Sequence, residues 1–358
     1  MKILHVITSL RTGGAEKLMV ELLPLLRNDG YEVELAIFNG EDTPFFRQLS
    51  KTGISIHSFM PNKGNVYSLS NLIKLSKLIR KGEYDIVHTH NTAPQLFAAL
   101  CKNKNFKLVT TEHGGSNRRR NWGWYRRIDR LMYERYDKII CIAKKAEENL
   151  REYIGKANVD IATINNGVDV AKFAEAIPSP ELERIAPGSR KIMMVAGFRW
   201  EKDQDTLIKA LQYLPDEFHL FLVGNGIRKN ELEKLCLDQG LSERVHFLGI
   251  RSDIPQLLHA ADFIVMSSHF EGLSLSSVEG MSVGKPFLAS DVDGLREVVK
   301  DAGILFPHGH SDTFANEILR LESDQKEYHR VASQCYSRAK NFDISKMKDG
   351  YLEIYNSL

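Results

Sequence analysis

The chain has 358 residues, of which 43% are hydrophobic and 26% charged, a composition typical of folded globular proteins and outside the range of disordered or fibrous chains. This length exceeds what one compact core usually holds and suits two domains of ordinary size. The formal net charge of +2 combines +9 in residues 1–165 (26 Lys and Arg against 17 Asp and Glu) with −7 in the remainder (22 against 29).

Short apolar segments alternate with glycine-bearing turns and helical patterns along the chain, as in a doubly wound parallel sheet. In the first half, strands are expected in residues 2–10, 31–38, 53–59, 84–90 and 107–113, with a helix in residues 17–30, and residues 138–150 and 159–169 close this half. Residues 174–188 contain prolines and are expected to form a linker. Second-half strands are expected in residues 191–198, 219–226, 244–249, 263–268, 285–291 and 303–307, with a final helix in residues 343–358.

The stretch from His269 to Pro286 carries two carboxylates, Glu271 and Glu279, around the start of a predicted helix that follows a buried strand. In an open α/β sheet such a turn lies at the carboxyl edge, where ligands bind. Free N–H groups of a helix N-terminus suit phosphate, and a carboxylate suits the hydroxyls of a sugar or ribose. The stretch therefore predicts a nucleotide-sugar site. Alternatively, Ser276 and Glu279 form a capping box, S-x-x-E, in which Glu279 only satisfies a backbone N–H.

The same stretch resembles the E-x7-E signature of retaining glycosyltransferases of family 4, and further motifs of that family follow in the right order along nearly the whole chain. The resemblance implies an α/β protein with the GT-B fold, in which two Rossmann-like doubly wound domains face a central cleft. Residues 1–167, joined by the C-terminal helix 343–358, would form the acceptor-binding domain. Residues 168–342 would form the donor-binding domain.

Carried over to this sequence, the family motifs imply roles for single residues. Gly13 and Gly14 of TGGAE would approach the donor diphosphate, although such a turn also serves as a plain strand-to-helix connector. His113 of TEHG would face the donor sugar, although a histidine at a strand end is often structural. Arg199 and Lys202 of FRWEKD would neutralise the diphosphate, against the alternative of ordinary surface charge.

The resemblance also implies the residues around the donor. Gly224 and Gly226 of VGNG would lie near the nucleotide, Glu271 would bind donor-sugar hydroxyls, and Glu279 would bind the ribose. The turn between the glutamates would complete the donor site with Gly272, Leu273, Ser274 and Leu275. Two positions depart from the family pattern, because Ser274 stands where proline is frequent and Gly280 where alanine is usual.

Two groups could be mistaken for metal ligands. Asp291 and Asp293 mimic a D-x-D motif but are expected to form a turn, and His88 and His90 share a strand without an evident third ligand. No metal and no cofactor are therefore expected. In the mechanism implied by the family, the leaving phosphate accepts the acceptor's proton, and cationic side chains replace a divalent ion.

The first half contains a dense group of basic and aromatic residues that could bind an anionic bilayer, a pyrophosphate-bearing acceptor or nothing but solvent. Its members are Arg118, Arg119, Arg120, Trp122, Trp124, Arg126 and Arg127, followed by Arg130. No nucleic-acid motif accompanies it, so nucleic acid is not expected as a partner.

The expected function is retaining transfer of a hexose-type sugar from a nucleotide sugar, with UDP favoured, to a saccharide or polyprenyl-diphosphate-linked saccharide, as in bacterial surface polysaccharide biosynthesis. A nucleotide-sugar epimerase of the same fold and a non-catalytic scaffold remain alternatives.

The four scattered cysteines lack a C-x-x-C pair, and no apolar run reaches the length of a membrane span. A cytoplasmic protein is expected, with a possible position at the inner face of the plasma membrane.

Overall fold

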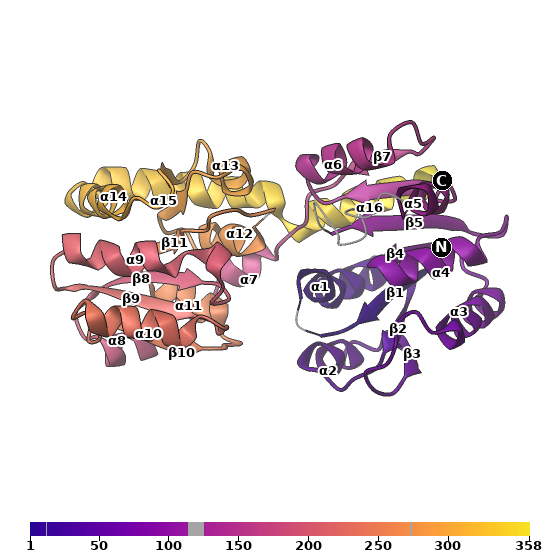
Figure 1. Ribbon diagram of the computed structural model, residues 1–358, viewed down its shortest axis with the longest axis horizontal. Helices are drawn as coiled ribbons and strands as arrows, with labels where there is room; N and C mark the ends of the chain where they lie inside the picture. Colours follow the sequence, from indigo (N-terminus) through magenta and orange to yellow (C-terminus); the bar gives the residue numbers. More distant parts are fainter. Residues whose placement is uncertain (12, 114–124, 273) are drawn as a thin grey trace. The chain divides into compact units, whose positions relative to one another are not determined.

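The structure is a computed structural model that describes residues 1–11, 13–113, 125–272 and 274–358. Within these residues the chain forms two compact units, Met1–Gly167 with Ile344–Leu358, and Val168–Asp343. Each unit contains one parallel β-sheet flanked by helices (Figure 1), which confirms the expected α/β class with two doubly wound domains. The acceptor-binding and donor-binding roles of the two units stay predictions.

The described residues of the first unit form a seven-stranded parallel sheet in the order β3-β2-β1-β4-β5-β6-β7. Its strands are β1 (Lys2–Ser9), β2 (Glu32–Asn39), β3 (Ser55–Met60), β4 (Ile86–His90), β5 (Lys107–Glu112), β6 (Lys138–Cys141) and β7 (Ile161–Thr163). Its helices are α1 (Gly14–Asn28), α2 (Pro44–Ser50), α3 (Leu69–Gly82), α4 (Thr92–Cys101), α5 (Tyr125–Tyr133), α6 (Lys144–Ile154) and α16 (Ile344–Ser357).

Helix α16 belongs to this first unit although it ends the chain, and in Figure 1 its yellow ribbon lies among the purple elements. Tyr351 and Tyr355 on one face of α16 are buried. The Tyr351 hydroxyl lies 3.1 Å from Thr111 Oγ1 of β5, and the Tyr355 hydroxyl is hydrogen-bonded to His88 Nδ1 of β4. Polar groups of the helix and the sheet therefore satisfy each other inside this core.

The described residues of the second unit form a six-stranded parallel sheet in the order β10-β9-β8-β11-β12-β13. Its strands are β8 (Arg190–Val195), β9 (Phe218–Val223), β10 (Val245–Gly249), β11 (Phe263–Met266), β12 (Phe287–Ser290) and β13 (Ile304–Phe306). Its helices are α7 (Val170–Ala174), α8 (Glu181–Ile185), α9 (Gln204–Ala210), α10 (Lys229–Asp238), α11 (Ile254–Ala260), α12 (Leu275–Ser282), α13 (Asp293–Val299), α14 (Ser311–Ser323) and α15 (Gln325–Ala339), with the 3₁₀ turns η2 (Trp200–Lys202), η3 (Leu211–Tyr213) and η4 (Lys340–Phe342).

The expected linker in residues 174–188 is wrong in part, because it contains helix α8. Leu182 of this helix is fully buried in the core of the second unit. Arg251 donates hydrogen bonds to Glu181 at 2.9 and 2.6 Å, which ties α8 to the loop after β10. The prolines of this segment suggested an irregular structure. The buried Leu182 and the ion pair of Arg251 with Glu181 instead hold helix α8 in place.

Strand order fixes where each unit offers a ligand site. The order reverses between β1 and β4 in the first sheet and between β8 and β11 in the second. At such a switch point the loops leave the carboxyl ends of neighbouring strands in opposite directions and open a crevice. No helix in the described ranges is long and apolar enough to cross a membrane.

Candidate functional site

The loop after β11 carries Glu271 to the switch point of the second sheet. Glu271 Oε1 accepts a hydrogen bond from Ser268 Oγ at 2.8 Å and is hydrogen-bonded to Lys202 Nζ. The side chain of Lys202 is only 15% exposed and that of Glu271 only 12%. The structure therefore brings two of the predicted catalytic residues together, and it adds Ser268, which the sequence analysis missed.

Two hydrogen bonds to backbone carbonyls join the loop after β11 to the turn η2. Ser267 Oγ donates to the carbonyl of Asp203 at 2.7 Å, and the His269 N–H donates to the carbonyl of Glu201 at 2.9 Å. The turn η2 thus lies against the end of β11. This pairing presents Lys202 to Glu271 across 69 positions of sequence.

Arg199 lies at the N-cap of η2, in the same turn as Lys202 but with a different partner. Its Nε lies 3.0 Å from Glu201 Oε1, and its side chain is 57% exposed. The expectation that the two cations act on one diphosphate stays a prediction. The guanidinium has solvent access and the ammonium is nearly enclosed.

Helix α12 begins at Leu275, with Ser274 as its N-cap. Ser274 Oγ accepts a hydrogen bond from the Ser277 N–H at 3.3 Å. The capping box of Ser276 and Glu279 is therefore wrong, because Glu279 lies a full turn inside the helix, where it is 6% exposed. The serine that replaces the frequent proline has a clear local role as the cap.

The close packing of α12 on the sheet explains why position 280 is a glycine. A Cβ at this position would lie 2.7 Å from Phe287 and 2.8 Å from Ile264, closer than side chains pack. Gly280 therefore lets α12 lie directly on β11 and β12. The departure from the usual alanine serves this packing.

The glycines of VGNG bring the loops after β8 and β9 into contact. Gly224 has a φ of +143°, and a Cβ there would overlap the carbonyl oxygen of Ala196. A Cβ at Gly226 would overlap the carbonyl oxygen of Phe198. Both glycines are required by the protein's own backbone, so their expected approach to a nucleotide stays a prediction. At Gly272, in contrast, a Cβ would meet no atom within 4 Å.

The D-x-D mimic lies beside the same loop. Asp291 Oδ1 and Asp293 Oδ1 accept hydrogen bonds from Arg296 at 2.6 and 3.2 Å. A Cβ at the next residue, Gly294, would overlap the carbonyl oxygens of Gly272 and Glu271. Gly294, which the sequence analysis did not single out, therefore lets this segment pack directly against the Glu271 turn. The two aspartates pair with Arg296.

In the first unit, Gly13 and Gly14 begin helix α1 after β1. The Gly13 carbonyl accepts a hydrogen bond from the Lys17 N–H at 2.9 Å, and a Cβ on Gly13 would overlap the Glu16 carboxylate. No atom lies within 4 Å of a Cβ built on Gly14. Burial raises the pKa of Glu16. Gly14 therefore borders open space next to a helix N-terminus.

His113 ends a chain of buried imidazoles. His113 Nε2 lies 2.8 Å from His90 Nδ1, and His90 Nε2 lies 3.0 Å from His5 Nδ1. Burial lowers the pKa of His113 to about 4 and that of His5 to about 3. Among the residues that the structure describes, the buried His113 Nδ1 has no hydrogen-bond partner. At neutral pH His113 is uncharged, and this ring nitrogen can bind a ligand.

The expectation that His88 and His90 lack a third possible ligand is wrong, because His5 on the adjacent strand β1 brings its ligand atom within 4.8 Å of theirs. Apart from His5 Nε2, the ring nitrogens of these three histidines are nevertheless engaged in hydrogen bonds. His88 bonds to Tyr355 and to Thr111 Oγ1, the latter at 2.8 Å, and His90 bonds to His5 and His113. The contacts favour a hydrogen-bonded network.

The predicted acceptor or membrane cluster is described only in part. Arg126 and Arg127 are exposed on α5, and Arg126 Nη2 donates to the carbonyl of Glu152 at 3.3 Å. The remaining predicted residues Arg118, Arg119, Arg120, Trp122 and Trp124, and the donor-site residue Leu273, lie outside the described residues.

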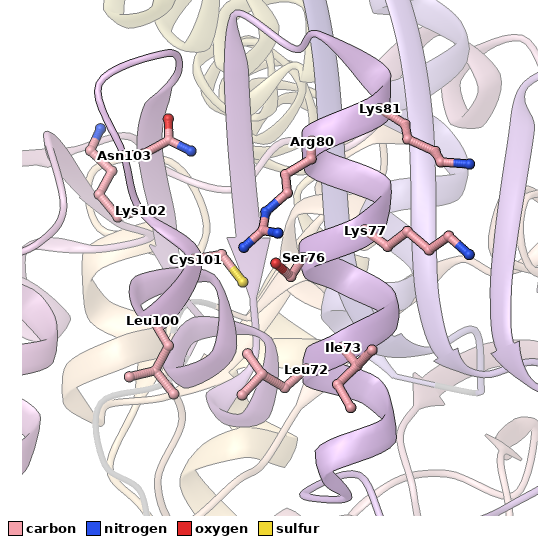
Figure 2. A pocket seen from close by; sticks show the side chains of 10 residues that line it. All are labelled: Leu72, Ile73, Ser76, Lys77, Arg80, Lys81, Leu100, Cys101, Lys102 and Asn103. Atoms are coloured by element: carbon pink, nitrogen blue, oxygen red, sulfur yellow. The ribbon is translucent and has the colours of Figure 1, made fainter.

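A groove of about 750 Å³ lies between α3 and the end of α4 (Figure 2). Lys77, Arg80 and Lys81 line it together with apolar residues such as Ile73 and Leu100. The predicted site residues are not part of its lining. The groove borders Lys102 before β5 begins, whereas His113 follows the end of β5, so the two lie at opposite ends of that strand.

Comparison with known proteins covers both units. Residues 12–172 match the family model Glycosyltransferase Family 4, and residues 175–338 match Glycosyl transferases group 1. The chain is 27% identical to the Escherichia coli UDP-Gal:alpha-D-GlcNAc-diphosphoundecaprenol alpha-1,3-galactosyltransferase over 99% of its own length and 96% of the relative's. It is 25% identical to the Bacillus anthracis N-acetyl-alpha-D-glucosaminyl L-malate synthase, over 96% and 93% of the two chains.

Solved structures agree with the fold. Anabaena HepE, crystallised with UDP, is similar over 100% of both chains with a TM-score of 0.86 and 24% identity. WaaG, a glycosyltransferase of lipopolysaccharide biosynthesis, is similar over 99% of both chains with a TM-score of 0.71 and 16% identity. These likenesses confirm the expected GT-B fold.

Proposed function

Since this chain belongs to the family 4, or group 1, glycosyltransferases, we propose that it transfers a hexose-type sugar from a UDP-sugar, with retention of anomeric configuration and without a metal ion. The acceptor is a saccharide or a polyprenyl-diphosphate-linked saccharide. The E. coli relative's name, a galactosyltransferase that uses UDP-Gal and a diphosphoundecaprenol-linked sugar, supports both choices. The UDP in the HepE crystal supports uridine as the nucleoside of the donor.

The observation that carries this proposal is the enclosed pair of Lys202 and Glu271 at the switch point of the second sheet. A lysine ammonium has three donors, so Lys202 can keep Glu271 and still donate to a phosphate oxygen. Breaking the bond between the sugar and the diphosphate leaves negative charge on the phosphate. Lys202 and the solvent-accessible Arg199 stabilise that charge without a divalent ion.

The two glutamates act on hydroxyl groups. Glu271 accepts from a hydroxyl of the donor sugar, because Ser268 and Lys202 already bond one of its oxygens and hold the carboxylate in place. Glu279 accepts from the ribose. Gly272 and Gly14 leave room for close approach of phosphate groups to backbone N–H groups.

His113 acts as a neutral group. Because burial lowers the pKa of His113 to about 4, it supplies a hydrogen bond from Nδ1 to a sugar hydroxyl and no positive charge at pH 7. No base-activated nucleophile is required. The leaving phosphate accepts the acceptor's proton on the same face, which gives retention.

A panel of nucleotide sugars tests the donor. A ligand at a hundred times its dissociation constant adds about 2.7 kcal/mol to stability, so the correct donor raises Tm measurably. Incubation of that donor with a polyprenyl-diphosphate-linked saccharide should then give a lipid-linked product with the donor's anomeric configuration. An isomerised sugar formed from donor alone would instead indicate an epimerase, and no turnover of any donor would indicate a scaffold.

A further inference from the structure

We propose that Asp203, His269 and His308 form a binding site for Zn²⁺ in the second unit, on the loops that carry Lys202 and Glu271 but with no part in the transfer chemistry proposed above. The three residues come from the turn after η2, the loop after β11 and the loop after β13. Their ligand atoms all lie within 4.8 Å of one another. Residues that lie 105 positions apart thus converge at one edge of the sheet with the nitrogen and oxygen donors that zinc prefers.

The distances fit a zinc site after a small adjustment. Zinc binds imidazole nitrogen and carboxylate oxygen at about 2.1 Å, so tetrahedral ligand atoms lie about 3.4 Å apart. Asp203 Oδ2 lies 3.8 Å from His269 Nδ1 and 4.0 Å from His308 Nε2. The two imidazole nitrogens are hydrogen-bonded to each other. A zinc ion would replace the proton that they share, move the two imidazoles apart to the spacing of metal ligands and draw the carboxylate inward.

The surrounding groups already orient the three ligands. Asp203 Oδ2 accepts a hydrogen bond from Thr206 Oγ1 at 2.6 Å, the kind of outer contact that positions metal-binding carboxylates. The Trp200 ring lies 4.4 Å from the His269 ring, centroid to centroid, and limits its rotation. The side chain of His308 is 41% exposed, so an ion and its remaining water ligand have access from solvent.

Backbone conformation supports a site at this position. Asp203 has a φ of +48°, a left-handed conformation that residues other than glycine adopt at a cost. The residue is only 4% exposed, so an uncompensated negative charge on its carboxylate is disfavoured there. A divalent cation would compensate the buried negative charge. The other histidine group, His5 with His88 and His90, lacks such access because all three residues are fully buried.

Isothermal titration of the full chain, without a purification tag, with Zn²⁺ alone tests the proposal. The wild type should bind one ion per chain, and His308→Ala should bind it at least about tenfold more weakly. His310→Ala is the matched control, because His310 lies in the same loop, is 60% exposed and pairs only weakly, at 4.0 Å, with Asp312. It should bind Zn²⁺ like the wild type.

His269→Ala provides a second test, and Tm without zinc establishes that each variant folds. Added Zn²⁺ should raise the Tm of the wild type and of His310→Ala, but not that of His308→Ala or His269→Ala. The proposal is overturned if the wild type binds no zinc, if His308→Ala binds it as tightly as the wild type, or if Mg²⁺ binds equally well. Since no sugar donor is present, the result is independent of the proposed transferase activity.

Discussion

Lys202 and Glu271 neutralise each other at the carboxyl edge of the second sheet, and neither side chain is more than 15% exposed. In the proposed mechanism the ammonium also bonds the leaving diphosphate. Lys202→Ala should therefore lower kcat about 10²- to 10³-fold, as expected for loss of one donor to the developing charge. Steady-state kinetics measures this, with Tm as the check on folding. Unchanged turnover would remove Lys202 from the mechanism.

Arg199→Ala should lower kcat/KM at least about tenfold while Tm stays near the wild-type value, because an exposed ion pair contributes little stability. Arg330→Ala is a matched control. Arg330 is 54% exposed and bonds Glu327 at 2.6 Å, much as the 57% exposed Arg199 pairs with Glu201 at 3.0 Å. Equal kinetic effects of the two substitutions would show that Arg199 is ordinary surface charge.

Glu279→Gln should bind the donor weakly and keep near-normal stability. Glutamine preserves the size of the side chain, and the cap of α12 is provided by Ser274. Only the carboxylate can accept from both ribose hydroxyls with full negative charge. Titration of UDP into both proteins measures the difference. Normal UDP affinity in the variant would assign Glu279 a structural role.

The buried histidines predict acid sensitivity of the first unit. His5 has a pKa of about 3 when folded against about 6.5 when unfolded, so the unfolded state binds more protons between these values and stability falls as pH drops below about 6.5. At pH 5 His5 alone should cost about 2 kcal/mol. Urea unfolding at pH 7 and pH 5 measures this loss. His5→Gln, which does not titrate, should show a smaller loss than the wild type.

The basic cluster predicts salt-sensitive binding to anionic liposomes. Replacement of Arg118, Arg119 and Arg120 by serine should remove about 3 kcal/mol of binding, at about 1 kcal/mol per residue. The control is a variant with serine in place of the groove residues Lys77, Arg80 and Lys81. It loses the same number of positive charges from another part of the first unit. Sedimentation with vesicles compares the two. An equal loss in both variants would show that net charge, not the cluster, drives binding.

The activity of the cluster variant provides a separate readout. Its transfer to a lipid-linked acceptor should fall, whereas slow hydrolysis of the donor should persist. Loss of both activities would assign the cluster to the donor site or to the fold.

The sequence predicted the strands well because each is a short apolar run that parallel sheets bury on both faces, as in β11 (Phe263–Met266). It predicted the start of α12 less well. Serines at 274, 276 and 277 all resemble caps, and only tertiary packing decides among them. Gly280 against Phe287 fixes the helix on the sheet, and Ser274 then lies at its end.

The contacts of the site depend on pairs far apart in sequence. No spacing rule links Lys202 to Glu271, or Gly294 to the carbonyl of Gly272, because these contacts arise only when neighbouring strands of the sheet align their loops. The same holds for His5, which joins His90 through strand register. Local pattern identified the residue types, and the register of the sheet determined their partners.

The position of α16 has a consequence for synthesis of the protein. The hydroxyl groups of Tyr355 and Tyr351, which bond His88 and Thr111, belong to a helix that follows the whole second unit in the sequence. Domains generally fold in the order in which they are translated. Here the first sheet receives the hydroxyl groups of α16 only after the second unit has been synthesised, so the second unit can complete its folding before the first.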